Sequence, residues 1–450
     1  MFRAMQRTYR ADNADKIADL WARQVERQAV LAWLYVDMNS YFASVEQHDR
    51  PDWRGRPLIV TPVTSEYSCA IAASYAAKAR GIKTGTRVKE ARQMCPDLIV
   101  VEARPDRYVA VHHQVREAVE RHIPVTDVCS IDEFACALTS HHQLPEMATL
   151  IGRRIQQEIL VSVGPALTAS VGIAATRMLA KLAADMHKPS GLTLLDPGAM
   201  PRPILHLPLS DFPGIGPAMA VRLARARVAT VADLWGLSPA RMRQLWRSIN
   251  GERFWYDLHG RDLPPLETRP PQTISHGHVL APELRPRLEA RKVVRRLTIK
   301  CGSRLRRMGY RCRGLVLSMR IDGGPRDTLE ARFASTQDTF ALLRACDGLW
   351  AQWQAQRPGA THLKKVNVTC LGLEAAAPAE PDLFSAQATD AVEATSDVAA
   401  RHLRLFAAMD ALNQRFGKDV VTLGPRPKIH SFVGAKIAFG RIPARAEFSE

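Results

Sequence analysis

The chain has 450 residues, which is enough for two to four domains, and its hydrophobic fraction of 46% is ordinary for a globular protein with sizeable cores. Its 62 Lys and Arg residues against 45 Asp and Glu give a formal net charge of +17, which indicates a polyanionic partner, either nucleic acid or an anionic membrane surface. No apolar stretch approaches the roughly 18 residues that cross a bilayer, and the N-terminus lacks the apolar core of a secretory signal, so we expect a cytoplasmic protein with no membrane partner.

The positive charge is concentrated in one part of the chain. Residues 271–374 contain 19 Lys or Arg and 8 Asp or Glu, more than a solvated surface usually carries, and this favours nucleic acid as the partner. The eight cysteines are scattered and no two form a CxxC pair. Zinc-ribbon spacing is therefore excluded, and reduced, buried thiols are the simplest interpretation.

Strand and helix signals alternate along the first part of the chain. Residues 1–30 are interpreted as an N-terminal extension that forms one charged helix. From Leu31 the pattern predicts a mixed α/β core with much antiparallel character. The expected strands span 31–36, 56–63, 98–101 and 166–173, with two more in a hairpin at 125–138, and the expected helices span 74–80, 107–122, 146–161 and 176–186.

Two of these strands end on carboxylates. The run LAWLYV leads into Asp37, and the run VTDVCSI leads into Asp132 and Glu133. Acidic side chains beside a core need a partner, and if the two strands are neighbours in one sheet, the three carboxylates converge. Such a cluster is typical of a two-metal phosphoryl-transfer site that holds paired Mg²⁺ ions. The alternative is that Asp37 is a turn residue and that Asp132 begins a loop.

The next segment is mostly helical, from the break at KPSG (188–191) to about residue 262. It contains FPGIGP at 212–217, followed by a helix at 218–226. A turn with Gly214 and Gly216 points backbone N–H groups outward beside a helix N-terminus, which suits a phosphate. The turn resembles a helix-hairpin-helix motif, and a simple helix connector is the alternative.

The remaining chain reads as a linker, a third domain and a tail. Residues 263–271 are Pro-rich and indicate a linker. Residues 272–374 follow the order βαββαβ, which predicts a four-stranded sheet with two helices on one face and the other face free to lie against a groove. Residues 375–450 are expected to be a flexible linker and C-terminal tail with one amphipathic helix at 400–416.

Five motifs give the sequence a family resemblance through their order and spacing: YVDMNSYFASVE, ASYAAKARGIKTG, CSIDEF, SVGIAATRMLAKLAADMHKPSG and DFPGIG. Together they resemble the Y family of translesion DNA polymerases. The resemblance implies an α+β, multidomain right-hand polymerase, with both its polymerase IV and polymerase V branches left open. The implied parts are a palm at 31–38 and 105–188, fingers at 39–104, a helical thumb with the helix-hairpin-helix at 189–262, and a βαββαβ little finger at 272–374.

The same resemblance assigns the acidic residues. Asp37, Asp132 and Glu133 match the catalytic, metal-binding carboxylates of the family. The backbone carbonyl of Met38 matches an additional ligand, and the implied cofactor is a pair of Mg²⁺ ions. Asn39 stands where many relatives have Asp, as it does in members that resemble the polymerase V catalytic subunit.

Four residues match nucleotide-binding positions of the family. Phe42 matches the steric gate, whose ring leaves room for hydrogen but not for hydroxyl at C2′; the alternative is an aromatic side chain that fills the core. Tyr75 and Lys78, one helical turn apart, and Lys181 match residues that hold the incoming triphosphate, with surface solvation as the alternative. Small side chains at 70–77 would leave a roomy site over the nascent base pair.

The implied macromolecular contacts are with DNA and a sliding clamp. Besides Gly214 and Gly216, the basic helix of 272–374 is expected to face template–primer phosphates, or half of its cations serve only solubility. Its cations are Arg291, Lys292, Arg295, Arg296, Arg304 and Arg307. The segment EPDLF resembles a clamp-binding peptide, with Leu383 and Phe384 as the apolar pair that docks.

The expected function is that of a monomeric, low-fidelity, Mg²⁺-dependent DNA polymerase. It would use deoxynucleoside triphosphates to extend primer–template DNA across damaged bases, in repair or the damage response. Two alternatives stay open: a catalytically inactive polymerase-like scaffold that recruits the clamp and partners to DNA, and a palm-type cyclase that acts on free nucleotides.

Overall fold

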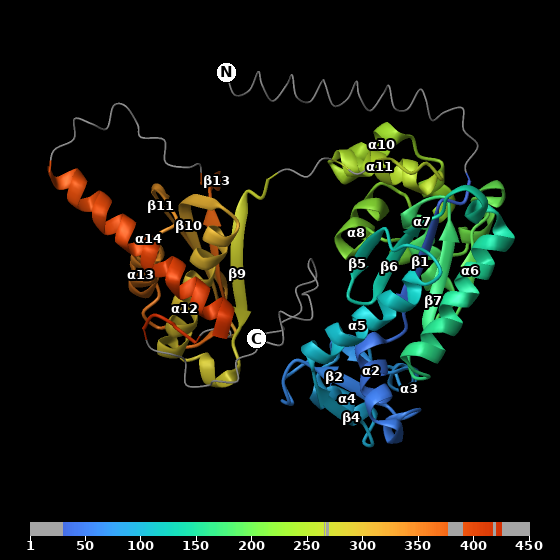
Figure 1. Ribbon diagram of the computed structural model, residues 1–450, viewed down its shortest axis with the longest axis horizontal. Helices are drawn as coiled ribbons and strands as arrows, with labels where there is room; N and C mark the ends of the chain where they lie inside the picture. The colour runs from blue at the N-terminus through green and yellow to red at the C-terminus, as the bar shows by residue number, and fades with distance from the viewer. Residues whose placement is uncertain (1–29, 265, 267–269, 377–389, 417–419, 425–450) are drawn as a thin grey trace. The chain divides into compact units, whose positions relative to one another are not determined.

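The computed structural model describes residues 30–264, 266, 270–376, 390–416 and 420–424. Nearly all of the predicted N-terminal extension and both candidate clamp residues, Leu383 and Phe384, lie outside the described residues. The described chain divides into two compact units at residue 265, inside the predicted linker 263–271. Unit 1 holds residues 30–264 and unit 2 holds residues 266–424, and each is described by itself (Figure 1).

A five-stranded sheet in the order β5-β6-β1-β7-β8 forms the palm of unit 1. Its pairs are antiparallel except for the parallel pair of β7 and β8. The central strand is buried on both faces, since Leu34 and Val36 enter one core and Tyr35 the other. The strands are β1 (Trp33–Met38), β5 (Asp127–Ser130), β6 (Glu133–Ala137), β7 (Ala169–Ala174) and β8 (Leu192–Leu194).

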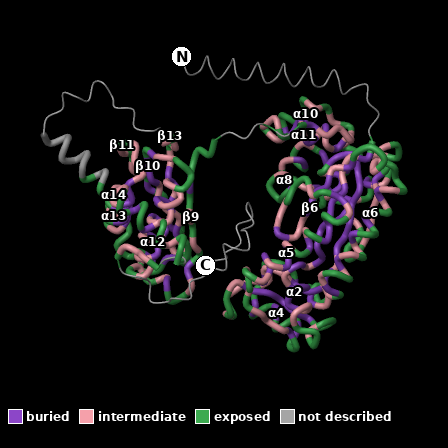
Figure 2. Tube along the Cα trace, viewed as in Figure 1, coloured by how far each residue is buried: buried purple, intermediate pink, exposed green. Residues whose placement is uncertain are grey.

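Helices cover both faces of the palm sheet, and the buried residues lie between the helices and the sheet (Figure 2). One core joins β1 to apolar residues of three helices, such as Tyr41, Val115 and Ile155. The other core joins Tyr35 to Leu179 and to the thumb. The palm helices are α2 (Tyr41–Asp49), α5 (Pro105–Glu120), α6 (Pro145–Glu158) and α7 (Arg177–Met186).

The fingers and the thumb are small domains at either end of the palm. The fingers contain a three-stranded sheet in the order β3-β2-β4 over a core of Ile59, Ala73, Ala77 and Ile82. The fingers elements are β2 (Leu58–Thr61), β3 (Ala72–Ala73), α3 (Tyr75–Ala79), α4 (Val88–Met94) and β4 (Ile99–Glu102). The thumb elements are α8 (Pro217–Arg225), α9 (Val231–Trp235), α10 (Pro239–Trp246) and α11 (Ile249–Leu258).

Unit 2 is a four-stranded antiparallel sheet in the order β11-β10-β12-β9, with two helices on one face. The predicted order βαββαβ is confirmed. The elements are β9 (Thr273–Val279), α12 (Arg287–Arg307), β10 (Tyr310–Ile321), β11 (Arg326–Thr336), α13 (Thr339–Gln356) and β12 (Leu363–Leu371), followed by the short β13 (Glu374–Ala375) and the long α14 (Asp390–Phe416).

Three details differ from the sequence-based expectations. β8 lies past the predicted palm boundary at 188 and adds a strand to the palm sheet. α2 and α4 were not predicted, because short runs such as YFASVEQHD mix polar and apolar residues without a clear period. α14 begins ten residues before the predicted helix, inside the segment expected to be a flexible linker. All eight cysteines are unpaired and six are buried, as expected. Among the described helices, none is both long and apolar enough to span a membrane.

Candidate active site

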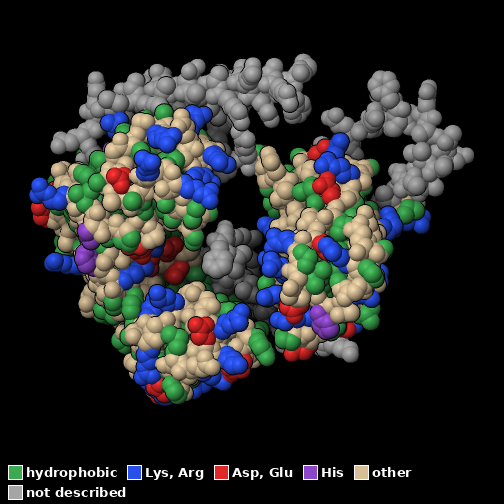
Figure 3. All heavy atoms as spheres, turned by 180° about the vertical axis from the view of Figure 1, so that it is seen from behind, with side chains coloured by type: hydrophobic (Ala, Val, Ile, Leu, Met, Phe, Trp, Pro, Cys, Tyr) green, Lys and Arg blue, Asp and Glu red, His purple; other side chains and the backbone are tan. Residues whose placement is uncertain are grey.

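The two acidic motifs meet at one end of the palm sheet. In the pairing of β1 with β6, Asp37 lies directly opposite Glu133. The backbone N–H of Met38 donates to the carbonyl of Asp132 over 2.9 Å. Asp132 itself sits in the turn between β5 and β6, where the Ser130 hydroxyl donates to its carboxylate over 2.6 Å. The structure therefore brings together the three carboxylates that the sequence singles out. Figure 3 shows recessed acidic side chains on the face of unit 1, with Lys and Arg side chains beside them.

Burial and charge crowding set the protonation of this cluster. Burial raises the pKa of Asp132 to about 6, and the charges of Glu133 and Asp37 add to this although the Ser130 hydrogen bond opposes it. Burial also opposes ionisation of Glu133, but the Lys181 ammonium outweighs it and lowers the Glu133 pKa. Three carboxyl groups this close together need positive charge nearby to ionise.

Two lysines supply positive charge. Lys181 Nζ contacts Asp37 and lies 2.6 Å from Glu133 Oε1. Lys188 Nζ lies 2.7 Å from Asp37 Oδ1 and 2.7 Å from Asp185 Oδ1. Lys188 is absent from the sequence-based predictions. Lys188 lies in the turn after α7, which ends at Met186, so helical spacing from Lys181 could not have found it.

Lys181 reaches the carboxylates because α7 packs closely on β7. A Cβ atom added to Gly172 of β7 would lie 2.0 Å from the carbonyl oxygen of Ala180 and 2.4 Å from the amide nitrogen of Ala184. Any side chain at Gly172 would therefore push α7 away from the sheet. The helix begins after Thr176, whose hydroxyl accepts a hydrogen bond from the N–H of Leu179 as an N-cap.

A divalent cation fits the donor set of this cluster. Carboxylate and backbone carbonyl oxygens are the ligands that Mg²⁺ prefers, and the crowded negative charge would be neutralised by it. In the part of the chain that the structure describes, no three Asp, Glu, His or Cys side chains already surround one point as ligands. Here the lysine ammonium groups balance the carboxylates. The side chains that would hold a cation are those of Asp37, Asp132 and Glu133.

The fingers bring Tyr75 and Lys78 to the same site. The Tyr75 hydroxyl donates to Asn39 Oδ1 over 3.4 Å, and Lys78 Nζ donates to Ser40 Oγ over 2.7 Å. Lys78 Nζ lies 4.4 Å from the centroid of the Tyr75 ring, so the two share one helix face as predicted. Burial and the charge of Lys188 lower the Lys78 pKa, whereas Asp37 acts to raise it.

Asn39 links the palm to the fingers as a neutral hydrogen-bonding group. It is 1% exposed, and its Nδ2 donates to Thr168 Oγ1 over 3.0 Å while its Oδ1 accepts from Ser170 Oγ over 2.9 Å. The amide thus bonds to Ser170 on β7, to Thr168 just before that strand, and to Tyr75. A carboxylate at this position would add a fourth negative charge to the crowded cluster.

Phe42, the expected steric gate, lies on α2 and is partly exposed. Its ring stacks on Tyr108 of α5 with centroids 4.4 Å apart and planes 12° apart. The Tyr108 hydroxyl donates to Glu46 over 2.8 Å, and Arg104 binds Glu46 through both carboxylate oxygens. The sequence analysis missed Tyr108 because its partner lies 66 positions away in the chain.

The glycine turn of the thumb is exposed. Gly214 has a φ of 95°, a left-handed conformation that favours glycine. A Cβ atom added to Gly216 would meet nothing within 4 Å, and Gly216 forms the N-cap of α8. The turn is preceded by a short 3₁₀ segment, Leu209–Asp211. The expected helix-hairpin-helix surface is thus open to a phosphate.

Several of the cations predicted to bind DNA on α12 have acidic partners within unit 2. Arg291 Nη2 lies 3.1 Å from Asp347 Oδ1, and Arg295 contacts the same carboxylate. Lys292 Nζ lies 2.7 Å from Glu289 Oε1. The role of α12 in DNA binding stays a prediction, and the remaining three cations are Arg296, Arg304 and Arg307.

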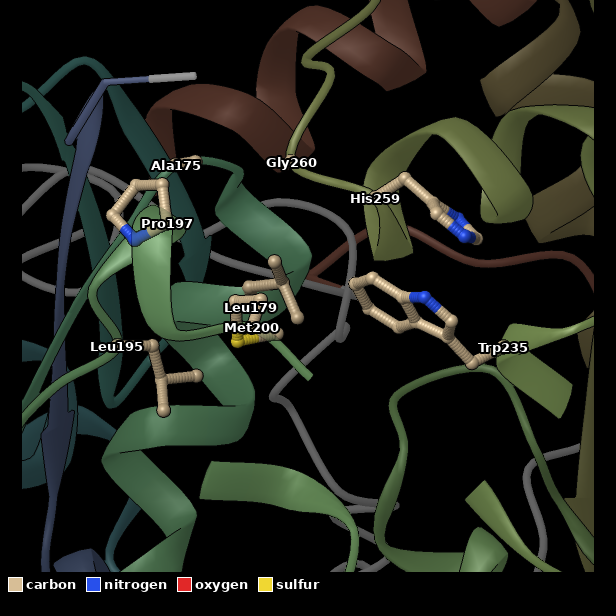
Figure 4. A pocket seen from close by; sticks show the side chains of 8 residues that line it. All are labelled: Ala175, Leu179, Leu195, Pro197, Met200, Trp235, His259 and Gly260. Carbon is tan, nitrogen blue, oxygen red and sulfur yellow. The ribbon is translucent and has the colours of Figure 1, made fainter. Parts of the chain in front are cut away.

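A separate cavity lies behind α7, away from the carboxylates (Figure 4). It has a volume of about 90 Å³ and is lined mainly by apolar side chains, including Leu179, Leu195 and Met200. Trp235 and His259 form its thumb side, with ring centroids 4.2 Å apart. It contains none of the predicted site residues.

Comparison with known proteins agrees with this geometry. Residues 36–185 match the impB/mucB/samB family, and residues 271–383 match the impB/mucB/samB family C-terminal domain. DNA polymerase IV of Moorella thermoacetica is 31% identical over 417 residues, which cover 90% of this chain and 98% of that protein. DNA polymerase IV of Gluconobacter oxydans is 39% identical over 201 residues, which cover 45% of this chain and 56% of that protein.

A solved structure shares the fold. The Y-family DNA polymerase chimera Dbh-Dpo4(243-245)-Dbh aligns with a TM-score of 0.62 at 21% identity, over 76% of this chain and 99% of that chain. The Moorella relative, aligned along nearly its whole length, shows more than the fold. It follows that this chain belongs to the Y family of translesion DNA polymerases and is a DNA-directed DNA polymerase with the right-hand α+β architecture.

Proposed function

We propose that the chain extends primers across damaged template bases by two-metal nucleotidyl transfer with Mg²⁺ and deoxynucleoside triphosphates. The observation that carries this proposal is the pairing of Asp37 with Glu133 across β1 and β6. It sets the carboxylates of two distant motifs at one end of one sheet, with Lys181 and Lys188 beside them. Paired carboxylates with nearby cations suit the transfer of a phosphoryl group.

Each residue of the site has a proposed task. Asp37, Asp132 and Glu133, with the Met38 carbonyl, would hold the metal ions. Bound there, the ions would favour ionisation of the primer 3′-hydroxyl and neutralise charge on the triphosphate and the leaving pyrophosphate. Phe42 would lie under the sugar and exclude a 2′-hydroxyl.

The cationic residues would bind and orient the triphosphate. When Asp37 and Glu133 ligate cations, Lys181 and Lys188 lose these two carboxylate partners, keep Asp185 as a partner, and can pair with phosphate oxygens. Lys78 and Tyr75, which lie together on α3, would add a charge and a hydroxyl donor from the fingers.

The small side chains of the fingers support low fidelity. Ala72 and Ala76 are the partly exposed members of this run, whereas Ala70, Ala73 and Ala77 lie in the core of the fingers, so the exposed part of the run offers few bulky contacts with which to test the shape of a nascent base pair. A damaged template base would be tolerated for the same reason, at the cost of discrimination between correct and incorrect pairs.

For unit 2 we propose that DNA lies against the face of the sheet opposite its helices. Arg320 is paired directly with Arg326 on one side and with Lys365 on the other. All three are exposed and alternate with core residues such as Met319, so they point away from α12 and α13. Like charges placed opposite each other destabilise a sheet unless an anion joins them. A row of three cations across three strands therefore fits a phosphate backbone.

Three further expectations stay predictions: a monomeric state, a cytoplasmic location and a sliding clamp as partner. The inactive scaffold is not favoured, because the metal-binding carboxylates are all present and the relatives are named as polymerases. The cyclase alternative lacks a use for the glycine turn and the basic unit 2.

The test is primer extension with Asp132→Asn and Glu133→Gln variants, compared with the exposed Asp52→Asn as a control. Loss of a metal-binding carboxylate should lower kcat by at least about 100-fold, whereas DNA binding and the control variant should stay at the wild-type level. Removal of Mg²⁺ by chelation should abolish extension by the wild type. Retained activity in both carboxylate variants would contradict the proposed mechanism.

A further inference from the structure

The fingers present an exposed aromatic ring on a loop that adjoins a segment with two exposed cations. Tyr67 lies in the connection between β2 and β3 and is 77% exposed, more than any other large hydrophobic side chain among the residues that the structure describes. An aromatic ring that is this exposed contributes little of the free energy that burial of its apolar surface would provide. A ring held in this way suggests a partner that covers it.

Hydrogen bonds and an ion pair brace the loop that carries Tyr67. The Tyr67 N–H donates to Ser65 Oγ over 3.3 Å, and the Ser68 N–H donates to the Ser65 carbonyl over 3.0 Å. Thr64 Oγ1 donates to Glu102 over 3.0 Å, and the Glu66 carboxylate pairs with Arg92 of α4. The exposure of the ring is therefore fixed by the backbone around it.

The start of α4 runs beside this loop and brings two exposed cations to it. Cys69 pairs with Arg87 in an antiparallel bridge, and the Lys89 N–H donates to the Glu66 carbonyl over 3.2 Å. Arg87 and Lys89 are both exposed. We call Tyr67, Arg87 and Lys89 the fingers patch. The backbone contacts place the three residues on adjoining segments, and an aromatic ring together with nearby cations is the combination with which proteins hold single-stranded nucleic acid, by stacking on bases and pairing with phosphates.

We propose that the fingers patch binds the unpaired template strand ahead of the primer end, with Tyr67 stacked on a base and with Arg87 and Lys89 at its phosphates. The inference rests on the proposed function, since template-directed synthesis always leaves unpaired template ahead of the active site. The chain path agrees with it, because β3 runs from this loop directly to Tyr75 at the active site. An aromatic ring can stack on the exposed face of an unpaired base, whereas the base faces inside a duplex are already covered by neighbouring bases. The Tyr67 ring should therefore prefer the single strand.

The test compares full-length protein bound to a primer–template with a six-nucleotide template overhang and to the blunt duplex of the same sequence. Tyr67→Ala should weaken binding to the overhang substrate by roughly 5- to 150-fold, the range for losing one stacked base, and leave binding to the blunt duplex unchanged. Tyr67→Trp should restore it. Val161→Ala, which removes another highly exposed apolar side chain of unit 1, serves as the matched control.

A second readout places the contact. The fluorescent base 2-aminopurine at the first or second unpaired template position should be quenched by the wild type and by Tyr67→Trp but not by Tyr67→Ala. Equal affinity of wild type and Tyr67→Ala for the overhang, or an equal loss on overhang and blunt substrates, would overturn the proposal. Primer extension by the wild type is measured alongside, because its absence would refute the proposed function whatever the patch binds.

Discussion

The rings of Phe42 and Tyr108 stack with centroids 4.4 Å apart, although they belong to different helices. The Tyr108 hydroxyl is tied to Glu46, which is 1% exposed and held by Arg104. The gate ring proposed for sugar selection therefore lies on a support that is fixed by a buried carboxylate. Selection between sugars should depend on both the ring and its support.

Substitution of the gate ring should relax sugar selection. Phe42→Ala opens space where a 2′-hydroxyl would clash, so we expect kcat/KM for ribonucleotides to rise by roughly 10- to 100-fold while that for deoxyribonucleotides changes far less. Single-nucleotide incorporation with each kind of triphosphate measures this. Unchanged ribonucleotide incorporation would return Phe42 to a role in packing.

The Glu46 carboxylate that holds Tyr108 should contribute to the free energy of unfolding. Glu46→Gln removes the carboxylate that Arg104 and Tyr108 share, and because the Arg104 side chain is 44% exposed, water can recover part of its hydration. We expect a loss of about 1 to 3 kcal/mol in the free energy of unfolding. Glu117→Gln, at an exposed position on α5, should change it by less than about 0.5 kcal/mol. Chemical denaturation measures both variants.

Much of the site can be predicted from the sequence, because its acidic residues directly follow strands that short stretches of sequence predict. Asp37 and Glu133 stand at the ends of apolar runs, and runs of that length predict strands whose ends carry chemistry. Lys188 and Tyr108 escaped because their partners lie across the fold, and only a known sheet order brings Tyr108 under Phe42 or Lys188 to Asp37. β8 escaped for a related reason: it has no strong period of its own and depends on pairing with β7, which is distant in the chain.

Docking of α14 on unit 2 is one such contact, and it should matter for stability. Phe406 is 1% exposed, lies 4.9 Å from the Phe340 ring, and has the Arg306 guanidinium over its face at 4.9 Å. Asp410 adds an ion pair with Arg306 at 2.7 Å. Phe406→Ala should cost about 3 kcal/mol or more by leaving a cavity. Phe416→Ala, on the same helix but 58% exposed, should cost little. Thermal unfolding that is equal for the two variants would show that α14 does not dock.

Acid should destabilise unit 2 through two histidines on β9. Burial lowers the pKa values of His276 and His278 to about 4, and the neighbouring Lys and Arg charges add to this. Because the unfolded chain binds these protons near pH 6.5 and the folded chain only near pH 4, stability is full above pH 6.5 and falls as the pH drops towards 4. Replacing both histidines by Gln should flatten this part of the pH profile. Replacing the exposed His141 of unit 1 should leave it unchanged, and unfolding followed between pH 4 and 7.5 distinguishes the cases.

The two surfaces of unit 2 can be compared directly as DNA-binding faces. Arg320 and Lys365 lie side by side on the open face of the sheet with no acidic residue opposite either, whereas Arg291 and Arg295 on α12 share the carboxylate of Asp347. A cation that meets a phosphate releases about one counterion. The pair Arg320→Gln and Lys365→Gln should therefore lower the slope of log K against log salt by roughly 2, at any DNA sequence. The pair Arg291→Gln and Arg295→Gln should lower it by less, because those side chains already have an anion within the protein. Titrations of primer–template binding at several salt concentrations decide between the faces, and a larger change for the α12 pair would move the DNA to the helical side.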